Sequence, residues 1–121
     1  MGGEGVVTVF VDAENVRRSR WPNVTREELV GLCRDWAEAE RCRVVVVFDG
    51  RPPEVDPGPG CELVGSNGGS ADDTIVREAQ ARARLGPVWV ATSDRGLRAR
   101  LVGVQRLVGG GSFLAELLRQ G

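Results

Sequence analysis

Short apolar runs alternate along this chain with stretches of helical periodicity, and this alternation restricts the fold more than any other feature. Residues 6–11 and 44–48 are rich in β-branched side chains, as strands buried on both faces of a sheet are. Shorter apolar runs follow at residues 61–64, 88–91 and 104–108, the last with polar residues that suit an edge strand. Strands that alternate with helices predict an α/β fold, with helices on both faces of a parallel sheet.

Four stretches carry helical signals. Thr25 and Glu28 form a capping box in front of a helix predicted over residues 26–40. Ser70 caps a second helix that runs to about Arg84, before a Gly-Pro stop. Two further helices are expected, around residues 97–101 and after Ser112, the latter preceded by a glycine hinge at residues 109–111.

Length and composition set outer limits. The 121 residues suit one domain over positions 1–121. No apolar run is long enough for a transmembrane helix, and no secretory signal is visible at the start, so no membrane association is expected and the cytoplasm is the default compartment. The three cysteines, Cys33, Cys42 and Cys61, fit no metal motif and are expected to be free thiols, largely buried.

Two absences exclude whole classes of chemistry. The chain has no histidine, so histidine acid–base catalysis, nucleophilic triads and histidine-ligated zinc are excluded. It has no lysine either, which removes the P-loop and Schiff-base chemistry. The net charge of −1 means that any nucleic acid would have to be bound by local arginine patches.

Aspartates recur where strands are expected to end. Asp12, Asp49 and Asp94 follow the first, second and fourth strands, and Asp72 and Asp73 open the helix that leads into the fourth. In an open parallel sheet all carboxyl ends lie at one edge, where ligands bind. Several carboxylates this close cannot all stay ionised without a counter-charge. Hard oxygen ligands without histidine or cysteine favour Mg²⁺ or Mn²⁺, which could activate water against a phosphate.

Most of these acids also have a structural explanation. Asp73 fits the far half of a capping box, and Asp72 suits a helix N-terminus. Asp94 fits an N-cap, and the Asp49-Gly pair is a common turn opener. Asp12 is the exception, because more chain is expected between it and any helix.

Polar neighbours of these aspartates are candidates for supporting roles. Asn15 is expected to order the loop near Asp12, with a plain loop asparagine as the alternative. Thr92 and Ser93 could hold a water or the last aspartate, or serve as an N-cap. Glu14 is expected to face solvent.

Arginines are the candidate contacts to nucleic acid. Arg17, Arg18 and Arg20 stand beside Trp21, a combination suited to phosphate contact and base stacking. An ordinary solvated charged face explains them equally well. The same two interpretations apply to the arginines near the proposed sheet edge, Arg51, Arg95 and Arg98.

The motifs taken together resemble a known family. Val-Asp12-Ala-Glu-Asn15, Val-Phe-Asp49-Gly, Ser-Ala-Asp72-Asp73, Thr-Ser-Asp94 and Gly-Ser112-Phe-Leu-Ala-Glu are similar to the motifs of NYN domains, which are PIN-like metal-dependent ribonucleases. The YacP-like bacterial branch is the most similar. The resemblance covers nearly the whole chain, with the motifs in the expected order.

This resemblance implies a three-layer α/β/α PIN-like fold with a five-stranded parallel sheet of order 3-2-1-4-5. It implies a Mg²⁺- or Mn²⁺-dependent nuclease, an endoribonuclease, with RNA as partner. The implied catalytic and metal-binding residues are Asp12, Asp72, Asp73 and Asp94, supported by Asn15, Thr92, Ser93 and the more variable Asp49.

Two rival functions remain open from the sequence. One is a non-catalytic PIN-like module that binds RNA or a protein, including a second copy of the chain, and a toxin-like PIN domain is a further possibility beside it. The other is a phosphatase of the aspartyl-phosphate type, which is disfavoured because such folds use a lysine that this chain lacks.

Overall fold

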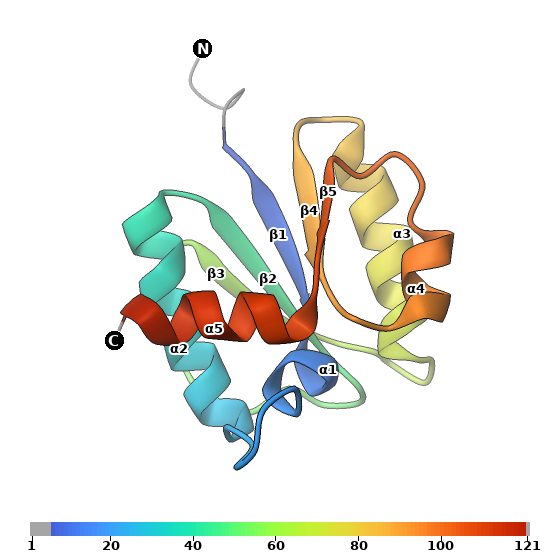
Figure 1. The fold of residues 1–121 in the computed structure, drawn as a ribbon. Helices are drawn as coiled ribbons and strands as arrows, with labels where there is room; N and C mark the ends of the chain where they lie inside the picture. The colour runs from blue at the N-terminus through green and yellow to red at the C-terminus, as the bar shows by residue number, and fades with distance from the viewer. Residues whose placement is uncertain (1–5, 121) are drawn as a thin grey trace.

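A five-stranded parallel sheet forms the centre of the computed structural model, which describes residues 6–120 (Figure 1). Its order is β3-β2-β1-β4-β5, as the family resemblance implied, with β1 in the middle and β5 at an edge. The strands are β1 Thr8–Asp12, β2 Arg43–Phe48, β3 Cys61–Gly65, β4 Val88–Ala91 and β5 Arg106–Val108. All five therefore point their carboxyl ends toward the same edge.

Helices cover both faces of the sheet. They are α1 Ala13–Arg17, α2 Arg26–Glu40, α3 Ala71–Ala83, α4 Arg95–Arg100 and α5 Gly110–Gln120. One face packs against α1, α2 and α5, and the other against α3 and α4 (Figure 1). The predicted α/β architecture of three layers is confirmed.

Residue alternation along the strands explains the two cores. In β1, Val9 and Val11 face the α2 side while Phe10 faces α3, and all three are at most 4% exposed. The same alternation runs along the apolar residues of β2, which lies beside β1 in parallel register. Burying each such side chain stabilises the fold by roughly 1.5–3 kcal/mol. The sheet is consequently a rigid base for the groups at its edge.

Helix α2 forms where its capping signals predict it. The Thr25 hydroxyl accepts a hydrogen bond from the Glu28 N–H at 3.0 Å, and the Glu28 carboxylate accepts one from the Thr25 N–H at 2.7 Å. The helix ends at Glu40, and its C-cap, Arg41, adopts a left-handed conformation with φ 55°. Trp36 is buried in the core and meets Phe113 of α5 edge to face at 5.1 Å.

Two local predictions were wrong. A short helix, α1, begins directly after Asp12, where a longer loop was expected. The glycine hinge at residues 109–111 does not exist as such, because α5 already starts at Gly110. The Gly110 N–H donates to the Ser93 hydroxyl at 2.7 Å, so the first residue of this helix is bonded to the loop after β4.

The described helices include none that is both long and apolar enough to cross a membrane. The three cysteines are free, with Cys33 and Cys61 buried and Cys42 half-buried. Burial raises the pKa of each thiol, to about 11 for Cys42 and Cys61, so they stay protonated and unreactive at neutral pH.

Candidate acidic site

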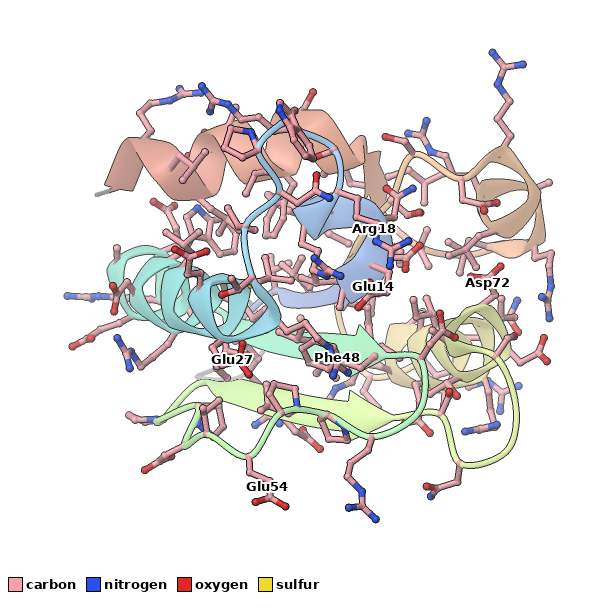
Figure 2. The ribbon with its side chains drawn as sticks, turned by 90° about the horizontal axis from the view of Figure 1, so that it is seen from below. Glu14, Arg18, Glu27, Phe48, Glu54 and Asp72 are labelled. Carbon is pink, nitrogen blue, oxygen red and sulfur yellow. The ribbon has the colours of Figure 1, made fainter. Side chains whose placement is uncertain are left out.

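The carboxyl ends of the central strands open into a cavity of about 590 Å³. Figure 2 looks at the molecule from below, with Glu14 and Arg18 together on the α1 side and Asp72 on the α3 side. The residues that line the cavity are Asp12, Glu14, Asn15, Arg18, Ser19, Asp49, Ser70, Asp72, Ser93 and Asp94. The topology thus gathers four aspartates from segments that are far apart in the sequence.

Asp12 is the buried member of this group. Only 7% of it is exposed, and its carboxylate accepts a hydrogen bond from the Thr92 hydroxyl at 2.8 Å. It occupies the N-cap position of α1 but makes no side-chain capping bond, so its side chain is left to face its acidic neighbours. Burial raises the pKa of Asp12 to about 6, against the hydrogen bond from Thr92, and the charges of Asp72 and Asp49 raise it further.

Asp72 shares this electrostatic environment. It is half-buried in the first turn of α3. Burial raises its pKa first, and the charges of Asp94 and Asp49 add to the effect. The carboxylates therefore repel one another across the cavity, and a cation among them would relieve that repulsion.

Asp49 and Asp94 are each held by a helix N-terminus. The Asp49 carboxylate accepts from the Ala71 N–H at 2.8 Å, and the Asp94 carboxylate accepts from the Leu97 N–H at 2.9 Å. The N-cap interpretation of Asp94 is confirmed, and it is compatible with a place in the cavity because the cap uses one oxygen. Asp49, the least secure of the sequence candidates, also lines the cavity.

Asp73 does not join this group. Its side chain is exposed and forms an ion pair with Arg100 at 2.8 Å, and the Arg100 guanidinium lowers the pKa of Asp73. Its backbone N–H bonds to the Ser70 hydroxyl at 3.1 Å, as a residue of a capped first turn does. Successive helical residues point in directions about 100° apart, so Asp72 and Asp73 cannot both face the cavity.

A polar scaffold fixes the loop between β4 and α4. The Asn15 side chain accepts from the Ser93 N–H at 2.9 Å, which ties α1 to this loop. The Thr92 hydroxyl, besides donating to Asp12, accepts from the Asp94 N–H at 3.1 Å. Asn15, Thr92 and Ser93 thus support the aspartates through hydrogen bonds.

The candidate arginines do not share one position. Arg18 lines the cavity, whereas Arg20, Arg51 and Arg95 are exposed and do not. Trp21 is 85% exposed on the loop after α1.

Glu14 was expected to face solvent, but its side chain is only 22% exposed and is surrounded by arginines. The sequence contained a signal for this contact, because Arg17 and Arg18 follow Glu14 by three and four residues, at the end of α1 and at its C-cap. Without α1, this spacing does not predict that the two arginines contact Glu14.

The donor set suits a hard divalent cation, held with the help of water. Among residues 6–120, no three His, Cys, Asp or Glu groups are close enough to hold a metal ion between them. Mg²⁺ commonly takes only one or two carboxylates and keeps several waters. The paired acids with raised pKa values, Asp12 and Asp72, offer such oxygens.

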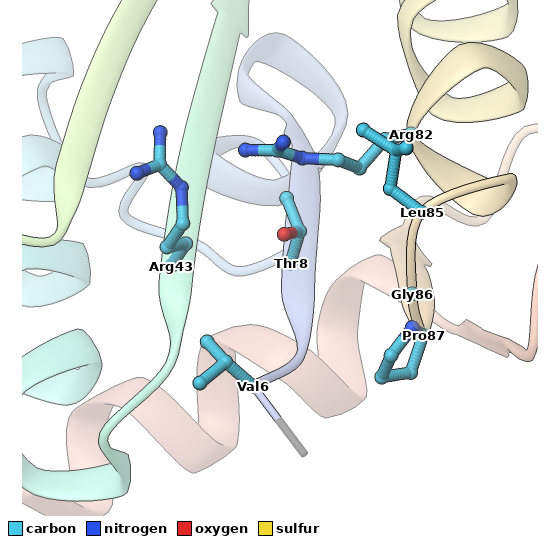
Figure 3. A pocket seen from close by; sticks show the side chains of 7 residues that line it. All are labelled: Val6, Thr8, Arg43, Arg82, Leu85, Gly86 and Pro87. Carbon is cyan, nitrogen blue, oxygen red and sulfur yellow. The ribbon is translucent and has the colours of Figure 1, made fainter. Parts of the chain in front are cut away.

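A second cavity, of about 360 Å³, lies by the amino ends of β1, β2 and β4. Arg43 and Arg82 stand on either side of Thr8 there, and Leu85 adds an apolar wall (Figure 3). Within the described part of the chain no carboxylate lines it. Its lining therefore differs in charge from that of the acidic cavity at the carboxyl edge.

No known family profile matches this chain, and no curated protein matches it in sequence. Solved structures do match. A point mutant of Rae1 (YacP) from Bacillus subtilis is 22% identical, with a TM-score of 0.77 over 95% of this chain and 77% of that one. A second structure of Rae1 (YacP) is also 22% identical, with a TM-score of 0.72 over 93% and 74%. The chain therefore has a YacP-like fold.

Proposed function

We propose that this chain is a Mg²⁺- or Mn²⁺-dependent ribonuclease that hydrolyses RNA phosphodiester bonds at the acidic cavity. The observation that carries the proposal is the convergence of Asp12, Asp49, Asp72 and Asp94 on one cavity at the carboxyl edge of the sheet. The YacP-like fold and the NYN-like motifs support the nuclease class.

Each residue has a role that follows from its surroundings. When bound, the metal supplies a hydroxide nucleophile and stabilises negative charge on the phosphate. Asp12 and Asp72 are the proposed ligands, because burial and neighbouring carboxylates disfavour their ionised forms and a nearby cation would offset both effects. Thr92 and Asn15 keep Asp12 and the loop after β4 in place, so the site needs little rearrangement when substrate arrives.

Incubation of the pure protein with RNA and Mn²⁺, beside Asp12→Asn, tests the proposal. We expect cleavage by the unmodified chain that EDTA stops, and loss of cleavage in the variant. Thermal unfolding of both proteins serves as the folding control. Cleavage that is absent, or that is equal in both proteins, would contradict the proposed catalytic activity.

A circular RNA separates the two modes of cleavage, since it has no ends. We propose endonucleolytic action, for which the circle is cut in the presence of Mn²⁺. Degradation of linear RNA alone would point to an exonuclease.

A non-catalytic RNA-binding module is the second candidate. It is favoured by one observation, that no three acidic groups in residues 6–120 are close enough to hold a metal ion between them. Calorimetry with Mg²⁺, together with RNA binding in the absence of any cleavage, would support it over the nuclease.

The proposed compartment is the cytoplasm. The three unpaired thiols support a reducing environment. RNA is the proposed partner.

A further inference from the structure

The carboxylate of Glu14 contacts three guanidinium groups at the edge of the acidic cavity. Arg17 and Arg18 reach its Oε1 atom through their Nη2 atoms, at 3.0 and 3.2 Å. Arg26 approaches Oε2 through Nε at 3.6 Å. One negative charge therefore faces three positive ones, which leaves a local excess of positive charge beside four aspartates.

Two of these arginines are fixed by other contacts as well. Arg17 is 19% exposed and donates from Nη1 to the Val24 carbonyl at 3.3 Å. Arg26 is 34% exposed and donates from Nη2 to the Arg51 carbonyl at 2.7 Å. Its guanidinium also lies over the Phe48 ring, 4.8 Å from the centroid. Their positions are determined by the fold.

Arg18 differs from both. Its side chain is 62% exposed, it lines the cavity, and its ion pair with Glu14 is the one side-chain interaction it makes within residues 6–120. Exposed ion pairs contribute little to stability, so exchanging this one for another anion costs little. Glu14 would keep the other two arginines as counter-charges after such an exchange.

We propose that Arg18 binds a backbone phosphate of the RNA strand in the cavity, and that Glu14 is its exchangeable counter-ion. The inference rests on the proposed function in taking RNA as the ligand of the cavity. Four aspartates repel a phosphate, and a guanidinium on the rim offsets that repulsion. Arginine suits the task because its planar group binds phosphate through two parallel hydrogen bonds.

Binding of a short fluorescein-labelled oligouridylate tests the role of Arg18, with EDTA present so that no metal-dependent cleavage intervenes. We expect Arg18→Ala to bind about tenfold more weakly, as loss of one charged contact implies. The slope of log affinity against log salt should fall by about 0.7, the value for one phosphate contact on a single strand. Arg18→Lys should keep the slope and bind more weakly than the unmodified chain.

Two controls separate this contact from general charge. Arg84→Ala removes the same charge from the C-cap of α3, an exposed position beyond the far end of that helix, and should leave binding within about twofold. Arg17→Ala should lower thermal stability while the salt slope stays that of the unmodified chain. Equal losses of affinity and slope in Arg18→Ala and Arg84→Ala would overturn the proposal.

A double-mutant cycle tests the exchange itself. Glu14→Gln removes the competing carboxylate and should tighten binding about threefold in the unmodified background, which corresponds to the upper part of the range for an exposed ion pair. In the Arg18→Ala background the gain should vanish. An equal gain in both backgrounds would show a general charge effect and overturn the role of Glu14.

The outcomes distinguish this inference from the nuclease proposal. Binding that depends on Arg18, without any cleavage on addition of Mn²⁺, leaves the phosphate contact standing and removes the nuclease. Cleavage on addition of Mn²⁺, together with RNA binding that is unaffected by Arg18→Ala, leaves the nuclease proposal standing and removes the phosphate contact.

Discussion

The burial of the Asp12 carboxyl group lowers the stability of the folded state when that group is ionised. Asp12 lies at the end of the central strand with only 7% of its surface exposed, and within residues 6–120 the Thr92 hydroxyl is the one side-chain donor to its carboxylate. An ionised carboxylate in such a place is under-solvated. Residues that are retained at the expense of stability are typical of functional sites.

The pKa of Asp12 predicts how stability depends on pH. It is about 6 in the folded chain and near 3.8 when unfolded, so the folded state binds more protons between these values. Stability therefore falls as pH rises through this window, by up to about 3 kcal/mol above pH 6. Asp12→Asn should raise the melting temperature at pH 7.5 in EDTA, and the gap should close near pH 4. A gap that is the same at both pH values would contradict this.

Asp72 and Asp73 are adjacent in sequence, but helix geometry directs their side chains to different places. Asp72 lines the cavity, whereas Asp73 pairs with Arg100 outside it. Asp72→Asn should lower Mn²⁺-dependent RNA cleavage by about a hundredfold or more, as loss of a group that stabilises the transition state does. Asp73→Asn should leave the rate within about twofold. Initial cleavage rates of the two variants at saturating Mn²⁺ measure the difference. An equal loss of rate in both variants would show that Asp73 also acts in the site.

At the scale of elements, the start of α5 is where three segments meet. Gly110 lies against the Asn15 side chain of α1 and donates its N–H to Ser93 after β4. A Cβ at Gly110 would overlap the Asn15 Oδ1 atom, whereas one at Gly111 would have its nearest neighbour at 3.9 Å. A side chain is therefore excluded at Gly110 and accommodated at Gly111.

These glycines form a matched pair for mutation. Gly110→Ala should displace Asn15 and lower stability by about 1–3 kcal/mol, the usual cost of overpacking. Gly111→Ala should be neutral or stabilising by up to about 1 kcal/mol, because alanine is the better helix former. Urea unfolding of both variants measures the difference. A Gly110→Ala variant as stable as the unmodified chain would show that the Asn15 contact is dispensable.

For the whole molecule, bound metal should be visible as added stability. A cation that binds the folded state alone stabilises it by about 2.7 kcal/mol at a concentration of a hundred times its Kd. Mn²⁺ should therefore raise the melting temperature of the unmodified chain, and the rise should be lost in Asp72→Asn. Thermal unfolding across a Mn²⁺ series measures it. No rise at any concentration would contradict metal binding at the cavity.

The sequence by itself determined the five strands, the four longer helices and the edge of the sheet at which the acids gather. The capping box at Thr25 and the apolar run of β2 depend on residues within a few positions of one another, so they can be recognised without a fold. The same local rules missed α1, whose five residues have no side-chain cap and whose buried residues, Ala13 and Val16, pack into the tertiary core.

Only the tertiary structure decided which acids share the cavity and what surrounds them. It turned Asp73 outward, brought Asp49 in, and joined Asp12 to Thr92 across 80 residues of chain. The three arginines around Glu14 come from α1, its C-cap and α2, and could not be grouped before those helices were placed. The physical reason is that the position of a residue along the chain predicts the end of the sheet at which it lies. The direction of its side chain depends on how each helix is rotated and packed against the sheet.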